Sequence, residues 1–304
     1  MTMRRRFATV LVTLGAVAAL AGCTSMPPNV DGNLTNAWPA MPVAKVSVPV
    51  AGVCYPTRPT GFGTGDETTV PCTATHDTET VYVGTFTGGD ADRSGAPAKG
   101  SPALATTFAD CRKNAVAYLG DDYYLGPMTL DVTVPVDAAW KGGARWYRCD
   151  IERYTDTQYQ VVASGTAKDG LRGARPLAIT CIVVSDTDKD HSRWDQFVPC
   201  TQPHNGEVAG LFTAPDVPWP ADEKTRDDIG GKGCEAVVAQ FLGLSGGRDT
   251  NTVLGWSWEP FDQDRWTLGD RTIRCVVLGF KNDAVNGVRF TGSVKGFGNR
   301  TPKV

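Results

Sequence analysis

The stretch VPCTQPHNGEV, residues 198–208, decides the fold, because its pattern occurs a second time as VPCTATHDTET at residues 70–80. In both segments a histidine follows the cysteine by four residues and a glutamate follows it by seven. The residues matched in this way are His76, Glu79, His204 and Glu207. Self-similarity of this kind marks an internal repeat. The sequence therefore predicts two similar units in tandem.

The cysteines follow the same repeat. Of the nine, Cys23 stands alone near the N-terminus and the other eight form two matching sets. The sets are Cys54, Cys72, Cys111 and Cys149, and Cys181, Cys200, Cys234 and Cys275. An even number of matched cysteines is typical of a disulfide framework in an oxidising compartment, and buried free thiols are the alternative.

Sequence alone does not select among the connectivities that four cysteines allow. We expect the first cysteine of each set to pair with the second, and the third with the fourth. A strand and its neighbour would carry the first pair. The buried cysteine of the helix would pair with the cysteine on the last strand to form the second bridge.

The N-terminus has the features of a lipoprotein signal. Arginines precede an apolar stretch, residues 7–21, which ends in the sequence LAGC at residues 20–23. LAGC resembles the lipobox of bacterial lipoproteins, and this resemblance implies cleavage before Cys23 and acylation, including palmitate, of that residue. Residues 1–22 are then a signal peptide, and 23–45 are the lipidated cysteine with a flexible tether. A plain secretory signal with an accidental Cys23 is the alternative.

Charge and hydropathy narrow the class of protein. The chain has 30 basic and 33 acidic residues, and loss of the signal arginines makes the mature chain more acidic. Nucleic acid is therefore not an expected partner. Nothing after Cys23 is long and apolar enough to span a membrane. We expect the protein to be held on the cell membrane by its lipid, facing outside the cytoplasm.

Beyond the tether we predict an α+β fold of two tandem units, residues 46–172 and 173–304. Each is expected to be a small, mainly antiparallel sheet with one packed helix, stapled by disulfides. Short apolar runs predict strands at 81–86, 177–184, 208–212 and 272–280.

A helix is predicted in each unit. In the first, Ser101 and Pro102 offer a start and Gly120 offers a stop, and the apolar spacing between them places Cys111 on the buried face. In the second, Cys234 takes the corresponding place. Glycines at 230, 231 and 233 leave the start of that helix uncertain.

The two His/Glu pairs are the sharpest chemical signal. Imidazole and carboxylate together suit zinc or a similar divalent ion, but each unit supplies only two such ligands, and oxidised cysteines cannot add to them. A metal would need both pairs to meet about a pseudo-twofold axis. We favour the structural interpretation, in which the imidazole satisfies backbone groups and the carboxylate orients it. His191, the third histidine, has no counterpart and is expected at the surface.

A tryptophan and an arginine also recur five residues apart, as Trp140 with Arg145 and Trp266 with Arg271. A guanidinium over an indole is favourable and can form part of a ligand site. A core tryptophan beside a turn is the interpretation that we favour.

These motifs together resemble the septum formation domain of exported actinobacterial proteins. The resemblance rests on Cys-x3-His-x2-Glu, a helix with a central cysteine, and Pro-x5-Trp-x2-Gly-x-Arg-x3-Cys. It covers about residues 46–300 in two copies, and the second copy fits better. The resemblance implies a link with cell division or the envelope, and it carries no catalytic residue and no cofactor.

Two functions stay open at this point. The first is a non-enzymatic binding or scaffold lipoprotein whose partner is an envelope or division protein or a cell-wall component. The second is a metal-dependent or wall-modifying enzyme built on the His/Glu pairs. We favour the first, because the chain shows no nucleophile elbow, zinc-protease helix or phosphate-binding loop.

Overall fold

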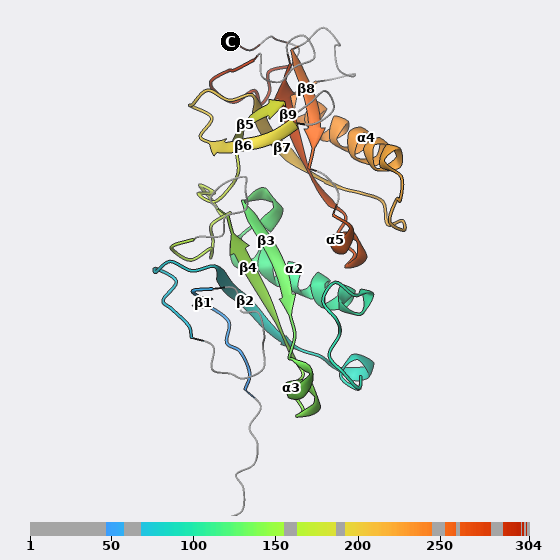
Figure 1. Ribbon diagram of the computed structural model, residues 1–304. Helices are drawn as coiled ribbons and strands as arrows, with labels where there is room; N and C mark the ends of the chain where they lie inside the picture. The colour runs from blue at the N-terminus through green and yellow to red at the C-terminus, as the bar shows by residue number, and fades with distance from the viewer. Residues whose placement is uncertain are drawn as a thin grey trace, which may run out of the picture. The chain divides into compact units, whose positions relative to one another are not determined.

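Two antiparallel sheets and a few helices make up the part of the chain that the structure, a computed structural model, describes (Figure 1). The predicted α+β class is confirmed. Cys23, the tether and His191 lie outside the described residues, and the boundary at 172/173 stays a prediction. Within the described part, no helix has the length and apolar character needed to cross a membrane. The described residues are 47–57, 68–154, 163–186, 192–244, 253–259, 262–280, 288–298, 300 and 302.

The first sheet has the strand order β1-β2-β4-β3. Helix α2, Ala105–Leu119, covers one face, and it buries Phe108, Cys111, Ala115 and Leu119 against that face. A 3-10 turn opens the helix at Pro102, and Gly120 ends it with a φ of 97°, a left-handed conformation that glycine adopts at no steric cost. The strands are β1 (Val53–Tyr55), β2 (Thr78–Thr85), β3 (Met128–Thr133) and β4 (Trp146–Arg153).

The second sheet has the order β6-β5-β7-β9-β8, and helix α4, Glu223–Leu242, packs against it. The strands are β5 (Cys181–Asp186), β6 (Ser192–Val198), β7 (Gly206–Thr213), β8 (Leu254–Trp258) and β9 (Thr272–Gly279). Shorter helical segments are η1 (Gly88–Asp90), η2 (Pro102–Leu104), η3 (Tyr123–Leu125), α3 (Asp137–Lys141) and α5 (Gln263–Thr267).

The expected strands are present, and their boundaries shift by up to four residues. The strand expected from Leu177 begins only at Cys181. Leu177 instead closes a turn onto Gly170 and packs against the core of the first sheet. The apolar character of Leu177 therefore indicates packing against the core, but it does not indicate a strand. Apolar periodicity alone does not distinguish a residue packed in a strand from one packed in another conformation.

Helix α4 begins well before the glycines that made its start uncertain. Asp222 caps it by accepting a hydrogen bond of 2.8 Å from the backbone N–H of Thr225. The glycines allow the helix to approach large rings closely. A Cβ atom at Gly233 would clash with the ring of Phe212, whereas one at Gly231 would lie in ordinary contact, 3.5 Å from Trp258.

Alanine at Gly233 and alanine at Gly231 should therefore have opposite effects on stability. Gly233→Ala is expected to lower the free energy of unfolding by about 1–3 kcal/mol through overpacking. Gly231→Ala is expected to raise it by up to about 1 kcal/mol, the gain in helix propensity. Denaturant unfolding of both variants measures the difference, and equal effects would contradict the close packing at Gly233.

All eight cysteines beyond the tether are paired, first with second and third with fourth in each set, which confirms the expected connectivity. The short bridge Cys54–Cys72 ties β1 to the segment before β2, and Cys181–Cys200 ties β5 to the segment between β6 and β7. The longer bridges, Cys111–Cys149 and Cys234–Cys275, fasten each helix to its sheet. No bridge joins the first set to the second.

Candidate functional site

The two histidines occupy the same environment in their respective sheets. His76 and His204 are at most 1% exposed, and the backbone of each forms a β-bridge, with Ala163 and Phe290 respectively. In each ring Nδ1 lies within hydrogen-bond distance of a carbonyl two residues earlier, at 2.8 Å for His76 and 2.7 Å for His204. These contacts support the interpretation that the imidazoles satisfy backbone groups.

The carboxylates hold a separate segment of each half. Glu207 accepts hydrogen bonds from the Ser293 hydroxyl at 2.5 Å and from the Val294 N–H at 2.7 Å. Glu79 accepts the equivalent pair from Thr166 and from the Ala167 N–H. The expectation that the carboxylate orients the imidazole is wrong, because its hydrogen bonds go to these backbone turns instead.

The electrostatics of these carboxylates agree with a structural role. Burial raises the pKa of Glu207, while the hydrogen bonds from Ser293 and Val294 act in the opposite direction. Glu79 has one further donor, the Tyr118 hydroxyl at 2.6 Å. Burial and the hydrogen bond to Glu79 raise the pKa of Tyr118 to about 12, so this hydroxyl keeps its proton and remains a donor at neutral pH.

A metal site shared by the two His/Glu pairs is not formed by the described residues. Potential ligand clusters occur separately in each half: Cys54, His76 and Glu79 in one, and Cys181, Cys200 and His204 in the other. The cysteines of both clusters are in disulfides, and a disulfide sulfur lacks the thiolate that binds metal.

The Trp/Arg pairs form stacked, backbone-anchoring contacts. Arg145 lies over the Trp140 ring at 4.3 Å and donates to the Ala91 carbonyl at 2.6 Å, and the Trp140 indole donates to the Arg93 carbonyl at 2.8 Å. Arg271 lies over Trp266 at 4.2 Å in the same way. These contacts fix the loops beside the short helices and support the core interpretation.

A polar cluster that no sequence pattern indicated joins the two sheets. We call it the Asp270 cluster and define it as Asp270, Arg265, Arg112 and Tyr123. The Tyr123 hydroxyl donates to the Asp270 carboxylate at 2.9 Å, Arg112 reaches it at 3.3 Å, and Arg265 forms an ion pair with it. Burial favours the neutral form of Asp270, but Arg265 and Arg112 outweigh it and hold the pKa of Asp270 below its usual range.

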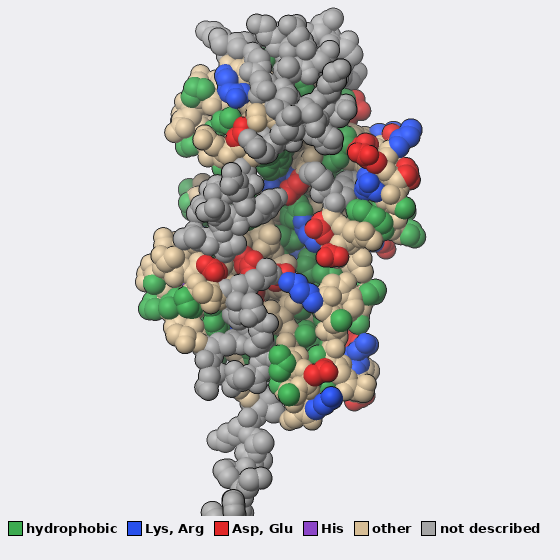
Figure 2. All heavy atoms as spheres, viewed as in Figure 1, with side chains coloured by type: hydrophobic (Ala, Val, Ile, Leu, Met, Phe, Trp, Pro, Cys, Tyr) green, Lys and Arg blue, Asp and Glu red, His purple; other side chains and the backbone are tan. Residues whose placement is uncertain are grey.

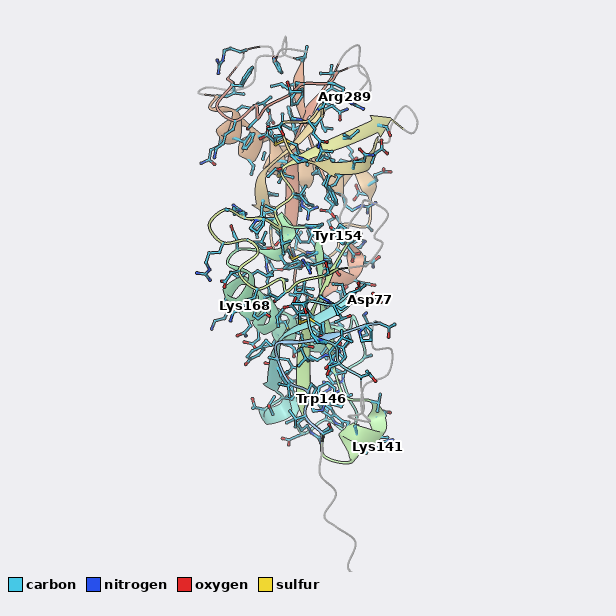
Figure 3. The ribbon with its side chains drawn as sticks, turned by 90° about the vertical axis from the view of Figure 1, so that its left-hand side faces the viewer. Asp77, Lys141, Trp146, Tyr154, Lys168 and Arg289 are labelled. Carbon is cyan, nitrogen blue, oxygen red and sulfur yellow. A yellow bond between two sulfur atoms is a disulfide. The ribbon has the colours of Figure 1, made fainter. Side chains whose placement is uncertain are left out.

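A second contact between the sheets lies beside the Asp270 cluster. The buried Arg274 donates to the Tyr124 carbonyl at 2.6 Å and to the Gly126 carbonyl at 3.1 Å, and pairs with Glu259 at 2.9 Å. The η3 turn of the first half is thereby fixed to strand β9. At the far end of β4 from Trp146, Tyr154 packs against Phe197 of β6 with ring centroids 6.1 Å apart (Figure 3).

A cleft of about 570 Å³ opens next to these contacts. Its apolar and aromatic lining includes Phe108, Tyr123, Tyr124 and Leu268. The acidic residues of the lining outnumber the basic ones, and in Figure 2 charged side chains surround apolar ones in the middle of the face that carries β3. The charged lining residues are Asp131, Glu152, Glu259, Asp262, Asp264, Lys99, Arg265 and Arg274.

One wall of the cleft is β3, the edge strand of the first sheet. Among the described residues strand β3 pairs only with β4, and residues 128–132 all line the cleft. The Pro127 carbonyl accepts from the Tyr154 N–H, so alternation along the strand turns the backbone groups of Leu130 and Val132 away from β4. An edge of this kind is a template for pairing with another extended chain.

Comparison with protein families gives one finding. The model of the family described as septum formation matches residues 51–275. The chain belongs to the septum formation family. Comparison with curated proteins and with solved structures found no match.

The septum formation match begins just before β1 and ends in β9, so it covers both sheets and the cleft between them. The match is a single span, and it does not by itself test the division into two repeats. The family's description supports a role connected with cell division. The resemblance seen in the sequence is thereby confirmed at the level of the family.

The septum formation motifs and the cleft are carried by different residues. The repeated His, Glu, Trp and Cys residues hold each half together, whereas the cleft residues have no shared spacing that a sequence pattern could reveal. The sequence offers one weak indication of the cleft. Acidic and basic residues are concentrated at 262–265, where a short helix of the second half begins.

Proposed function

We propose that this protein is a lipid-anchored, non-enzymatic binding module that acts outside the cytoplasm in cell division. The anchor is Cys23, and the flexible tether at 23–45 gives the folded part its reach from the membrane. The partner is an envelope or division protein, bound as an extended segment. Family membership supports the connection with division.

The observation that carries the binding role is the cleft bordered by the free edge of β3. An extended segment that adds to β3 gains backbone hydrogen bonds, and the apolar and aromatic lining offers contacts to its side chains. The excess of acidic lining favours a segment with basic side chains. The buried carboxylates Glu79, Glu207 and Asp270 are engaged in structural contacts, which supports a role without catalysis.

The anchoring and the septal role are tested by the location of the protein in dividing cells. We expect an exported, fluorescently tagged copy to be enriched at midcell, and a Cys23→Ser copy to be released from the membrane fraction. An even distribution of the first copy around the cell would remove the septum from the proposal. Retention of the second in the membrane would remove the lipid anchor.

The cleft is tested with a variant pair at Val132. Val132→Pro removes the outward-facing N–H, so it should abolish midcell enrichment; proline is tolerated at the edge of a sheet. Val132→Ala loses the same packing but keeps the N–H, so it should stay at midcell. If both variants behave alike, with thermal unfolding confirming that both are folded, strand addition at β3 is wrong.

A further inference from the structure

Both buried histidines have a ring nitrogen without a partner. A carbonyl oxygen only accepts hydrogen bonds, so the contacts of Nδ1 with Ala74 in His76 and with Gln202 in His204 require the proton to be on Nδ1. The neutral ring then carries its lone pair on Nε2. In both residues Nε2 is buried and has no hydrogen-bond partner within the described part of the chain. Histidines that bind metal are commonly held in this way, with the other ring nitrogen donating to a backbone carbonyl.

Sulfur atoms lie close to each of these rings. In the second half, the ligand atoms of Cys181, Cys200 and His204 all lie within 4.8 Å of one another. In the first half, Cys54, His76 and Glu79 do the same. Tetrahedral zinc holds its ligands about 2.0–2.3 Å away, which separates ligand atoms by about 3.3–3.8 Å. Separations of at most 4.8 Å are compatible with this spacing, apart from the bond between the sulfurs.

The bridges beside the histidines are also the ones that a reductant can reach. Cys72 and Cys200 are partly exposed. The four cysteines of the helix-to-sheet bridges are each 0% exposed, and none belongs to a potential ligand cluster among the described residues. These four are Cys111, Cys149, Cys234 and Cys275. Mild reduction should therefore open only the histidine-linked bridges and leave each helix fastened to its sheet.

We propose that reduction of Cys54–Cys72 and Cys181–Cys200 creates one zinc site in each half. A dithiol supplies two electrons and two protons to each bridge, which becomes two thiols while the dithiol becomes a disulfide. Zinc binding then displaces the proton of each thiol that becomes a ligand. In the second half the ligands are Cys181, Cys200 and His204 Nε2, with the fourth position left to water. In the first half the ligands are Cys54, His76 Nε2 and Glu79, again with the fourth position left to water. The oxidised protein has no such site.

The experiment uses the full chain carrying Cys23→Ser, so that no thiol outside the bridges contributes. The protein is reduced mildly with a dithiol, freed of it by gel filtration under nitrogen, and titrated with Co²⁺, whose absorption reports thiolate ligation and tetrahedral geometry. We expect thiols from the two short bridges only, about two equivalents of Co²⁺ per chain, and displacement by Zn²⁺. The oxidised protein should bind none.

His76→Asn and His204→Asn are the deciding variants. An asparagine amide keeps a donor near the backbone carbonyl but supplies no Nε2. Each variant should therefore bind one equivalent of Co²⁺ fewer than the parent protein. His191→Ala, the change of the third histidine, should keep both. The proposal is overturned if the reduced protein keeps its helical circular dichroism and binds no Co²⁺. It is equally overturned if both Asn variants bind as the parent does, or if reduction unfolds the chain and Zn²⁺ does not restore it.

Discussion

Replacement of Asp270 by alanine is expected to lower the free energy of unfolding by about 3–5 kcal/mol, the range for breaking a buried ion pair. The Asp270 carboxylate is fully buried and is the common acceptor for Arg265, Arg112 and the Tyr123 hydroxyl. Its loss leaves the Arg265 guanidinium and the buried Tyr123 hydroxyl without their carboxylate, whereas Arg112 keeps its ion pair with Asp122. The two sheets lose their main polar link in the same step.

Denaturant unfolding, followed by tryptophan fluorescence and by circular dichroism, measures this effect. Asp264→Ala is the matched control, because Asp264 is an exposed acidic residue on α5 next to Arg265. We expect the control to change stability by less than about 0.5 kcal/mol. Equal effects of the two variants would mean that the Asp270 cluster does not hold the sheets together.

Low pH should weaken the interaction of Asp270 with Arg265 and Arg112. The pKa of Asp270 is lowered from its ordinary value of 3.8 in the folded protein, so ionised Asp270 stabilises the fold above pH 3.8. This stabilisation is lost as the pH falls below 3.8 and through the folded-state value. Burial raises the pKa of Asp150, which therefore acts in the opposite direction. Asp270→Asn should unfold with a weaker pH dependence in this acid range, and an unchanged dependence would contradict the role of Asp270.

The second large effect is expected for the bridge between α4 and β9. Cys234→Ser combined with Cys275→Ser should lower the free energy of unfolding by about 2–5 kcal/mol, because the bridge closes a loop with a sequence separation of 41. Both cysteines are fully buried, so the serine hydroxyls add the cost of buried polar groups.

Cys23→Ser is the control for the cysteine changes, since that residue belongs to the proposed tether and should leave unfolding unaffected. A loss below about 1 kcal/mol in the double variant would show that packing of Val238 and Leu242 already holds α4 in place. The measurement is denaturant unfolding of the oxidised protein.

The repeat made much of each half predictable from sequence. Matched cysteines gave the bridges, and apolar spacing between Pro102 and Gly120 gave helix α2. No bounds were predicted for strands β1, β3, β4, β6 and β8. The start of α4 was uncertain because helix propensity penalises its glycines, whereas Gly233 is set by its contact with Phe212.

The cleft and the Asp270 cluster could not be predicted in the same way. Tyr123 and Asp270 come from different halves, and no local pattern states which surfaces of two similar units will meet. The His/Glu pairs were predicted to be structural, which agrees with their contacts. The predicted partner of the carboxylate, the imidazole, was wrong. The Glu207 carboxylate instead accepts hydrogen bonds from Ser293 and Val294, which lie far along the chain and approach it only after folding.

Each disulfide joins a cysteine to the next cysteine along the chain. For an exported chain that leaves the membrane N-terminus first, this order has a kinetic consequence. Every bridge can close as soon as its second cysteine emerges, before any competing thiol of a later pair is present. Oxidative maturation of the protein should therefore need an oxidase that forms bridges, but little help from an isomerase that reshuffles them.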